Sequence, residues 1–288
     1  MKELNIFCFG FGLVAKEFIK KLLSEKYNLN IAITTRQESK IIEFLGQKIS
    51  SFEFNNDKID KNIFKKLKDF DHILISIPPE YERDLVLKYF SKEILNRNIK
   101  WVTYLSATSV YGNHEGEWVD ENSKTFPISK NGIERLAVEK VWLKMYEKNN
   151  IPLQIFRLSG IYSNIYNVLE RIRSGNASLI RKENQFFSRI HVEDIANLLF
   201  LSLNKLKKGE IFNISDDKPA SSEEVMKYGA KILNLPEPKE IKLEDIESEM
   251  LKAFYRDSKK VSNKKVKEFF KYNLKFPTYV EGLNYINK

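Results

Sequence analysis

Two glycines and an alanine near the N-terminus have the spacing of a phosphate-binding turn. The motif GFGLVA at residues 10–15 follows an apolar run, Leu4–Phe9, and precedes apolar residues at helical spacing. In a strand-turn-helix context the first glycine permits a tight turn, and the second lets the backbone approach a pyrophosphate. The helix N-terminus also favours an anion. The pattern predicts a dinucleotide site, with a tight turn that holds no ligand as the alternative, and its residues are Gly10, Phe11, Gly12, Leu13 and Ala15.

The second predicted strand, Asn30–Thr34, runs into Thr35 and Arg36. Sites for NAD usually place an acid about 20 residues beyond the glycines, where it holds the ribose hydroxyls. No acid stands at this strand end, and a guanidinium can pair with a 2′-phosphate that a carboxylate would repel. We therefore expect NADP(H) rather than NAD(H), with a solvated Arg36 as the alternative. Further cofactor contacts are expected from residues that follow strands or lie at their ends: Thr35, Asn55, Ser76 and Pro78. For Asn55 and Ser76, a role in ordinary loop turns is the alternative.

Short apolar runs alternate with helical periodicity through the first half of the chain. The strand candidates are Leu4–Phe9, Asn30–Thr34, Ile49–Phe54, His72–Ile77, Trp101–Leu105 and Leu153–Leu158. Such alternation predicts an α/β fold with a parallel sheet and helices on both faces. The carboxyl edge of such a sheet is where ligands bind. The second half is less regular, and its expected elements are helices over Tyr166–Gly175, Asp194–Leu203 and Ser222–Leu233 and a strand over Glu210–Ile214.

Composition narrows the classes of protein and partner. The 288 residues are 42% hydrophobic, which is enough for a substantial core. The net charge is +9, but basic residues are interleaved with acidic ones along the chain, so we expect no nucleic-acid partner. A single cysteine, Cys8, and the lack of a signal-peptide pattern or of ~20 consecutive apolar residues predict a cytoplasmic protein without a membrane span. No cluster has metal-ligand spacing, so no metal is expected.

Five ordered motifs resemble the extended and atypical short-chain dehydrogenase/reductases, the nucleoside-diphosphate-sugar epimerase-like group. They are TYLSATSVYG at 103–112, FRLSGIY at 156–162, FSRIHVEDIA at 187–196, FNISDD at 212–217 and KKVSN at 259–263. The resemblance implies a Rossmann-type doubly wound parallel sheet with a smaller, interleaved C-terminal substrate region. It divides the chain into an NADP(H)-binding domain, 1–160, joined by segments near 186–215, and a mostly substrate-binding region, 161–288. It also implies a small, sugar-nucleotide-like substrate and leaves a homodimer as one option.

The resemblance further implies a Ser/Thr-Tyr-Lys triad, from which this chain departs at each position. Asn131 stands where the Tyr would be, Arg135 where the Lys would be, and Ala107 at the Ser/Thr position. An asparagine amide does not titrate near neutral pH, and an arginine stays protonated there, although it can hold a ribose hydroxyl or a phosphate. The candidate catalytic residues are therefore Ser106, Thr108, Tyr111, Asn131 and Arg135, and Arg135 is also a candidate cofactor contact. The alternative for Asn131 and Arg135 is a polar patch on a helix near the cofactor that has no role. Tyr162 and His191 are further replacements, although a lone histidine is more often structural.

Two functions stay open on this basis. One is an NADP(H)-dependent epimerase-, dehydratase- or reductase-like enzyme that uses non-standard acid/base groups. The other is a non-catalytic NADP(H)-binding sensor or interaction protein on the same fold. The missing Tyr matters because a general acid/base contributes about 10²–10⁴-fold in rate.

Overall fold

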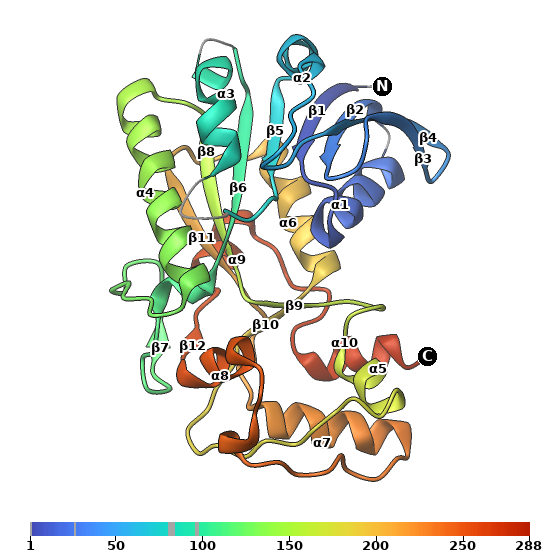
Figure 1. Cartoon of the computed structure of the whole chain (residues 1–288), viewed down its shortest axis with the longest axis vertical. Helices are drawn as coiled ribbons and strands as arrows, with labels where there is room; N and C mark the ends of the chain where they lie inside the picture. The colour runs from blue at the N-terminus through green and yellow to red at the C-terminus, as the bar shows by residue number, and fades with distance from the viewer. Residues whose placement is uncertain (1, 26, 80–83, 96–97) are drawn as a thin grey trace. The chain divides into compact units, whose positions relative to one another are not determined.

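A computed structural model describes residues 2–25, 27–79, 84–95 and 98–288. The chain divides into two compact units, each assembled from three separate segments (Figure 1). Unit 1 contains Met1–Ser106, Glu134–Phe156 and Ile195–Ile211. Unit 2 contains Ala107–Ile133, Arg157–Asp194 and Phe212–Lys288.

An eight-stranded sheet forms the framework of unit 1, in the order β11-β8-β6-β5-β1-β2-β4-β3. Strand β1 pairs in parallel with β2 on one side and β5 on the other, so the strand order reverses between β1 and β5. Such a reversal is where an open α/β sheet binds ligands. The strands are β1 (Lys2–Phe9), β2 (Tyr27–Thr35), β3 (Lys40–Phe44), β4 (Gln47–Glu53), β5 (His72–Ile75), β6 (Trp101–Ala107), β8 (Leu153–Leu158) and β11 (Glu210–Ile214).

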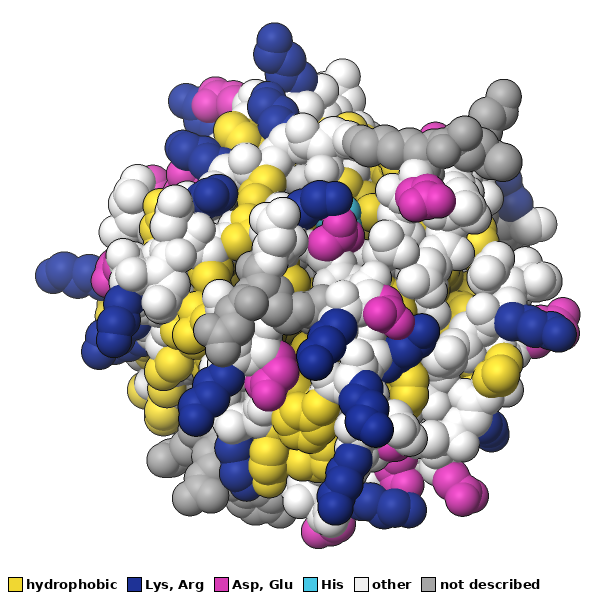
Figure 2. Space-filling view, turned by 90° about the horizontal axis from the view of Figure 1, so that it is seen from above, with side chains coloured by type: hydrophobic (Ala, Val, Ile, Leu, Met, Phe, Trp, Pro, Cys, Tyr) yellow, Lys and Arg dark blue, Asp and Glu magenta, His cyan; other side chains and the backbone are white. Residues whose placement is uncertain are grey.

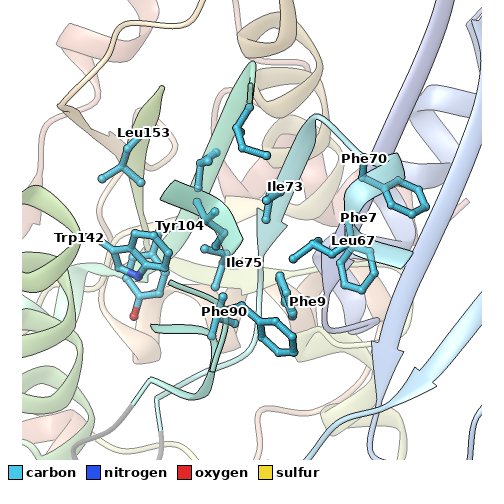
Figure 3. Packing of buried hydrophobic residues seen from close by; sticks show 14 of the residues in the cluster. Phe7, Phe9, Leu67, Phe70, Ile73, Ile75, Phe90, Tyr104, Trp142 and Leu153 are labelled. Atoms are coloured by element: carbon cyan, nitrogen blue, oxygen red, sulfur yellow. The ribbon is translucent and has the colours of Figure 1, made fainter. Parts of the chain in front are cut away.

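Helices cover both faces of this sheet, as Figure 1 shows. On one face, Trp101 of β6 stacks on Phe18 of α1 (Leu13–Ser24) and donates its indole N–H to Ser202 of α6 (Val192–Asn204). On the other face, the core in Figure 3 joins β-strand residues to α3 (Leu85–Leu95) and α4 (Lys130–Asn149), through Phe90 and Trp142. Alternating apolar side chains thus build a core on each face, and the predicted doubly wound α/β fold is confirmed.

The connection after β2 contains a hairpin that the sequence did not predict. Strands β3 and β4 form an antiparallel hairpin, with β4 then pairing in parallel with β2. Leu45 and Gly46 join the two strands with φ of 51° and 77°. Two consecutive residues with positive φ are typical of a type I′ turn, which suits the twist of a hairpin. The strand predicted over Ile49–Phe54 is the second arm of this hairpin, and a short helix, α2 (Asn62–Lys66), follows it.

Unit 2 combines short strand pairs with helices. Strands β9 (Gly160–Tyr162) and β10 (Arg189–His191) pair in parallel, as do β7 (Trp118–Val119) and β12 (Lys260–Val261). Helix α7 spans Ser222–Leu233, as predicted, and Ser221 caps it by accepting a hydrogen bond from the Glu224 N–H. The other helices of unit 2 are α5 (Val168–Arg173), α8 (Glu249–Arg256), α9 (Lys264–Phe270) and α10 (Tyr279–Ile286).

The surface shown in Figure 2 carries Lys and Arg side chains interspersed with Asp and Glu. Opposite charges that alternate in this way give a solvated surface rather than one continuous basic field. Among the described residues, no helix combines the length and the apolar character that crossing a bilayer requires.

Candidate functional site

The turn after β1 is locked by contacts at the point where the strand order reverses. Gly10 has φ of 101°, and its N–H donates to the Thr34 hydroxyl at 2.9 Å. The Ser76 hydroxyl, which follows β5, donates to the Phe9 carbonyl at 3.1 Å. A Cβ on Gly10 would lie 2.7 Å from this hydroxyl oxygen. The first glycine of the motif is therefore required both by its backbone angle and by the close approach of Ser76.

Gly12, unlike Gly10, has open space where a side chain would be. It is the N-cap residue of α1, no side chain caps the helix there, and no atom lies within 4 Å of where a Cβ would be. The first N–H groups of a helix need acceptors, and the helix dipole favours a negative charge beside them. Ala15 is fully buried, which allows α1 to pack closely on the sheet. The open, uncapped helix end fits the pyrophosphate of a dinucleotide.

Three of the predicted cofactor contacts, Thr35, Arg36 and Asn55, lie at or just beyond the ends of β2 and β4. Arg36 is exposed, and its carbonyl accepts a 3.5 Å hydrogen bond from the Asn55 amide. The Asn55 side-chain oxygen accepts from the N–H groups of Asp57 and Lys58, so Asn55 shapes its own turn. The Thr35 hydroxyl lies 3.3 Å from that of Ser51 on β4. These contacts hold the backbone around Arg36, while Pro78 lies exposed after β5.

The residues at the triad positions have different environments. In unit 1, the Arg135 guanidinium donates to the Leu105 carbonyl at 2.8 Å, and the buried Ser106 hydroxyl has no hydrogen-bond partner among the described residues. In unit 2, Asn131 is exposed in the first turn of α4, and Ala107 and Thr108 are half-buried. Arg135 therefore stabilises the end of β6, where Ser106 lies.

Tyr111 is fully buried within unit 2, and its hydroxyl group is engaged. The hydroxyl donates to the Asn213 side-chain oxygen at 2.7 Å and accepts from Arg157 at 3.0 Å. The Arg157 guanidinium also lies 4.9 Å from the centre of the tyrosine ring. Burial, partly offset by Arg157, raises the pKa of Tyr111 to about 12. Tyr111, which ends a short 3-10 helix, is therefore a structural anchor that is hydrogen-bonded to Arg157 of β8 and Asn213 of β11.

Tyr162 and His191 belong to an aromatic cluster in unit 2. Their rings meet edge to face at 5.0 Å, and Phe276 lies 4.2 Å from His191. His191 accepts a hydrogen bond from the Glu193 N–H. The adjacent Asp194 carboxylate accepts from the Tyr272 hydroxyl and from two backbone N–H groups of the C-terminal segment. The FSRIHVEDIA motif thus fastens the C-terminal segment within this unit.

A pocket of about 570 Å³ lies within unit 2. Its residues come from 160–176, 187–189 and 222–226 together with Phe254. Tyr166, Phe254 and Ile165 form an exposed apolar rim, and they are 64%, 47% and 66% exposed. The pocket has the size of a small-molecule site. No sequence motif predicted it, because its lining is assembled from segments far apart in the chain.

Two arginines give the pocket its positive charge. Arg189 is half-buried and donates to the carbonyls of Phe187 and Ala220, so its guanidinium is largely used in holding the wall of the pocket. Arg171 also lines the pocket, on α5, and among the described residues no ion pair engages it. Glu170 is held by Arg173 at 2.6 Å. Arg171 is therefore the cation best placed to meet an anionic ligand in this pocket.

Comparisons with known proteins extend these observations. A protein-family model, the NAD dependent epimerase/dehydratase family, matches residues 86–215. A solved structure of a functionally unknown conserved protein from Silicibacter pomeroyi is 30% identical, with 98% of this chain and 97% of that chain covered and a TM-score of 0.86. A search of curated proteins found no match.

Two more distant solved structures share the fold. UDP-glucuronic acid 4-epimerase from Bacillus cereus, in complex with NAD, is 16% identical, with 98% of each chain covered and a TM-score of 0.78. dTDP-glucose 4,6-dehydratase from Bacillus anthracis, also in complex with NAD, is 17% identical, with 99% of this chain and 95% of that chain covered and a TM-score of 0.76. With its glycine turn at the sheet's reversal point and these matches, the chain belongs to the NAD-dependent epimerase/dehydratase family.

Proposed function

We propose that the chain is an NADP(H)-dependent enzyme of the epimerase, dehydratase or reductase type that acts on a small, sugar-nucleotide-like substrate. The observation that carries the proposal is the open helix end at Gly12, beside a Gly10 turn locked against Thr34 and Ser76. The N–H groups of α1 would hold the pyrophosphate there. When bound, the nicotinamide would supply or accept a hydride, and the protein's own residues would bind and orient it.

Arg36 supports the preference for NADP(H). It is exposed directly after β2, at the strand end where sites for NAD usually place an acid. Calorimetric titration with NADPH and NADH tests this preference directly. We expect NADPH to bind at least ten-fold more tightly, and Arg36→Glu to remove that difference by weakening NADPH alone. Equal affinities for the two nucleotides in the wild-type protein would overturn it.

The unit 2 pocket supports a nucleotide-like substrate. Its aromatic rim suits a flat base, and Arg171 suits an anionic group. The relatives named above suggest UDP- and dTDP-linked sugars as the first compounds to test. Binding of UDP or of a UDP-sugar, followed by cofactor oxidation or reduction during turnover, would support the proposal. Cofactor binding with no turnover across such a panel would count against it.

The groups that handle the proton must differ from the family pattern. Tyr111 is engaged by Arg157 and Asn213, and the Asn131 amide cannot titrate. The remaining candidates are Ser106, whose buried hydroxyl has no partner among the described residues, and Thr108. We propose that one of these two hydroxyls hydrogen-bonds a substrate oxygen. The reaction then lacks the ~10²–10⁴-fold contribution of a side-chain acid at residue 131.

A second candidate function is cofactor binding without catalysis, as in a redox sensor. The hydrogen bond of Arg135 to the Leu105 carbonyl favours it, because it occupies the side chain at the family's lysine position. Hydride transfer by the wild-type protein that is lost in Gly12→Val would exclude this candidate. The double variant Asn131→Tyr/Arg135→Lys offers the reverse test. Turnover that only this variant shows would mean that the wild-type protein binds the cofactor without using it.

A further inference from the structure

The tip of the β3–β4 hairpin reaches the phosphate-binding turn. The rings of Phe44, the last residue of β3, and Phe11 meet edge to face with centroids 5.2 Å apart. The Lys16 ammonium lies 5.3 Å from the centre of the Phe11 ring. Phe11 stands between the two glycines of the motif, so the hairpin contacts the cradle itself.

The hairpin is shaped to place Phe44 there. The turn at Leu45 and Gly46 reverses the chain within two residues, and Phe44 pairs with Gln47 across it. At the base of the hairpin, the Ser39 hydroxyl donates to Asp60 and accepts from the Glu53 N–H. Leu45 at the tip is 63% exposed, whereas Phe44 and Phe11 are half-buried. The hairpin thus turns one aromatic side chain inward and leaves its neighbour in solvent.

We propose that Phe44 and Phe11 form the aromatic wall of the adenosine site, an inference that rests on the cofactor binding proposed above. In a dinucleotide fold the adenosine lies between the glycine turn and the end of the second strand. Phe11 belongs to that turn. Arg36 directly follows that strand end, and the hairpin begins shortly after it, at Lys40. An aromatic ring offers its face to a purine, while Lys16 and Arg36 provide positive charge for phosphates. The hairpin is therefore a determinant of cofactor affinity.

The test compares Phe44→Ala with Leu45→Ala, a neighbour on the same tip that faces solvent. Binding of NADPH, of 2′,5′-ADP and of reduced nicotinamide mononucleotide, which lacks adenosine, is measured by calorimetry. We expect Phe44→Ala to weaken NADPH and 2′,5′-ADP about ten-fold and to leave the mononucleotide unchanged. Leu45→Ala should change each affinity by less than two-fold. Unchanged 2′,5′-ADP binding in Phe44→Ala would overturn the proposal.

A second variant guards against a folding defect in Phe44→Ala. Phe44→Trp keeps an aromatic face, and we expect it to bind 2′,5′-ADP as the wild-type protein does and to gain an emission component that the adenine quenches. Tight binding without quenching would show that residue 44 lies away from the adenine and overturn the proposal. If the wild-type protein binds neither NADPH nor 2′,5′-ADP, the cofactor function itself fails. If it binds both and Phe44→Ala binds them equally well, only the hairpin's role fails.

Discussion

The Arg135 guanidinium donates a 2.8 Å hydrogen bond to the backbone carbonyl of Leu105, which joins α4 to the end of β6. The carbonyl lies one residue before Ser106, in a strand that is buried along most of its length. Lysine would have to reach the same oxygen with a single ammonium group, whereas the planar guanidinium offers several N–H groups in fixed directions. Arg135 therefore stabilises the packing of α4 against the end of β6.

Replacing Arg135 tests how much this hydrogen bond stabilises the protein. We expect Arg135→Met to lower the free energy of unfolding by about 1.5–3 kcal/mol, since a charged donor is lost and the Leu105 carbonyl is left without it. Urea unfolding measures the change. The control is Lys140→Met, an exposed position on α4, which should shift stability by less than about 0.5 kcal/mol. Equal unfolding midpoints for Arg135→Met and wild type would contradict the prediction.

The two glycines of the cradle should respond differently to the same substitution. Gly10→Ala forces a Cβ to within 2.7 Å of Ser76 at a positive φ, so we expect a loss of about 2 kcal/mol or more of stability. A Cβ at residue 12 meets no protein atom, so the stability of Gly12→Ala should stay within about 0.5 kcal/mol of wild type. The added methyl group would stand where the pyrophosphate is proposed to approach the backbone, so NADPH affinity should fall at least ten-fold. Thermal unfolding and calorimetry separate the two effects. A Gly12→Ala protein that binds NADPH normally would rule out the open helix end as the pyrophosphate site.

Arg171 and Arg173 provide a matched pair for testing the unit 2 pocket. Arg171 lines the pocket, whereas Arg173, on the same helix, bonds Glu170 and Asn287. We expect Arg171→Ala to weaken UDP binding about ten-fold, because a charge-assisted hydrogen bond to phosphate is lost. Arg173→Ala should leave UDP affinity within two-fold. Isothermal titration with UDP provides both values, and similar losses in the two variants would point to a general charge effect instead.

His72 should make the protein less stable in acid. Burial lowers the pKa of His72 below its usual value of 6.5, although Asp71 beside it acts in the opposite direction. Because the unfolded chain takes up a proton at a higher pH than the folded protein, stability falls as pH drops through 6.5 toward the lowered pKa. Urea midpoints at pH 7.5 and 5.5 should therefore differ less for His72→Gln than for wild type. An equal or larger loss in the variant would refute the assignment.

The sequence predicted those elements that are determined by residues close together in the chain. The GFGLVA turn, the apolar strands around it and the helix over Ser222–Leu233 are set by residues next to one another. The hairpin was not predicted, although Leu45 and Gly46 form a compact turn. Its first strand is short and largely exposed, so its apolar residues show no clear period of two.

The environment of the site residues depends on contacts that no local pattern records. The Tyr111 hydroxyl is hydrogen-bonded to Asn213, which is 102 positions away in the sequence, and to Arg157, which is 46 positions away. The pocket likewise combines Tyr166 with Phe254. The Phe11–Phe44 contact depends on the twist of the β3–β4 hairpin, because this twist decides where the tip of the hairpin lies. Such relationships arise from tertiary packing, and sequence spacing alone does not determine them.

The interleaved segments of the two units have a consequence for how the chain is made. Unit 1 needs residues as late as Ile211, so a ribosome must have synthesised all of residues 1–211 before this unit can be completed. Until then the apolar faces of β1 and β5 lack their later partners and are open to wrong associations. Neither unit is a contiguous stretch that can be excised and expressed alone. Truncation at any segment boundary should therefore yield aggregated chain rather than a smaller folded protein.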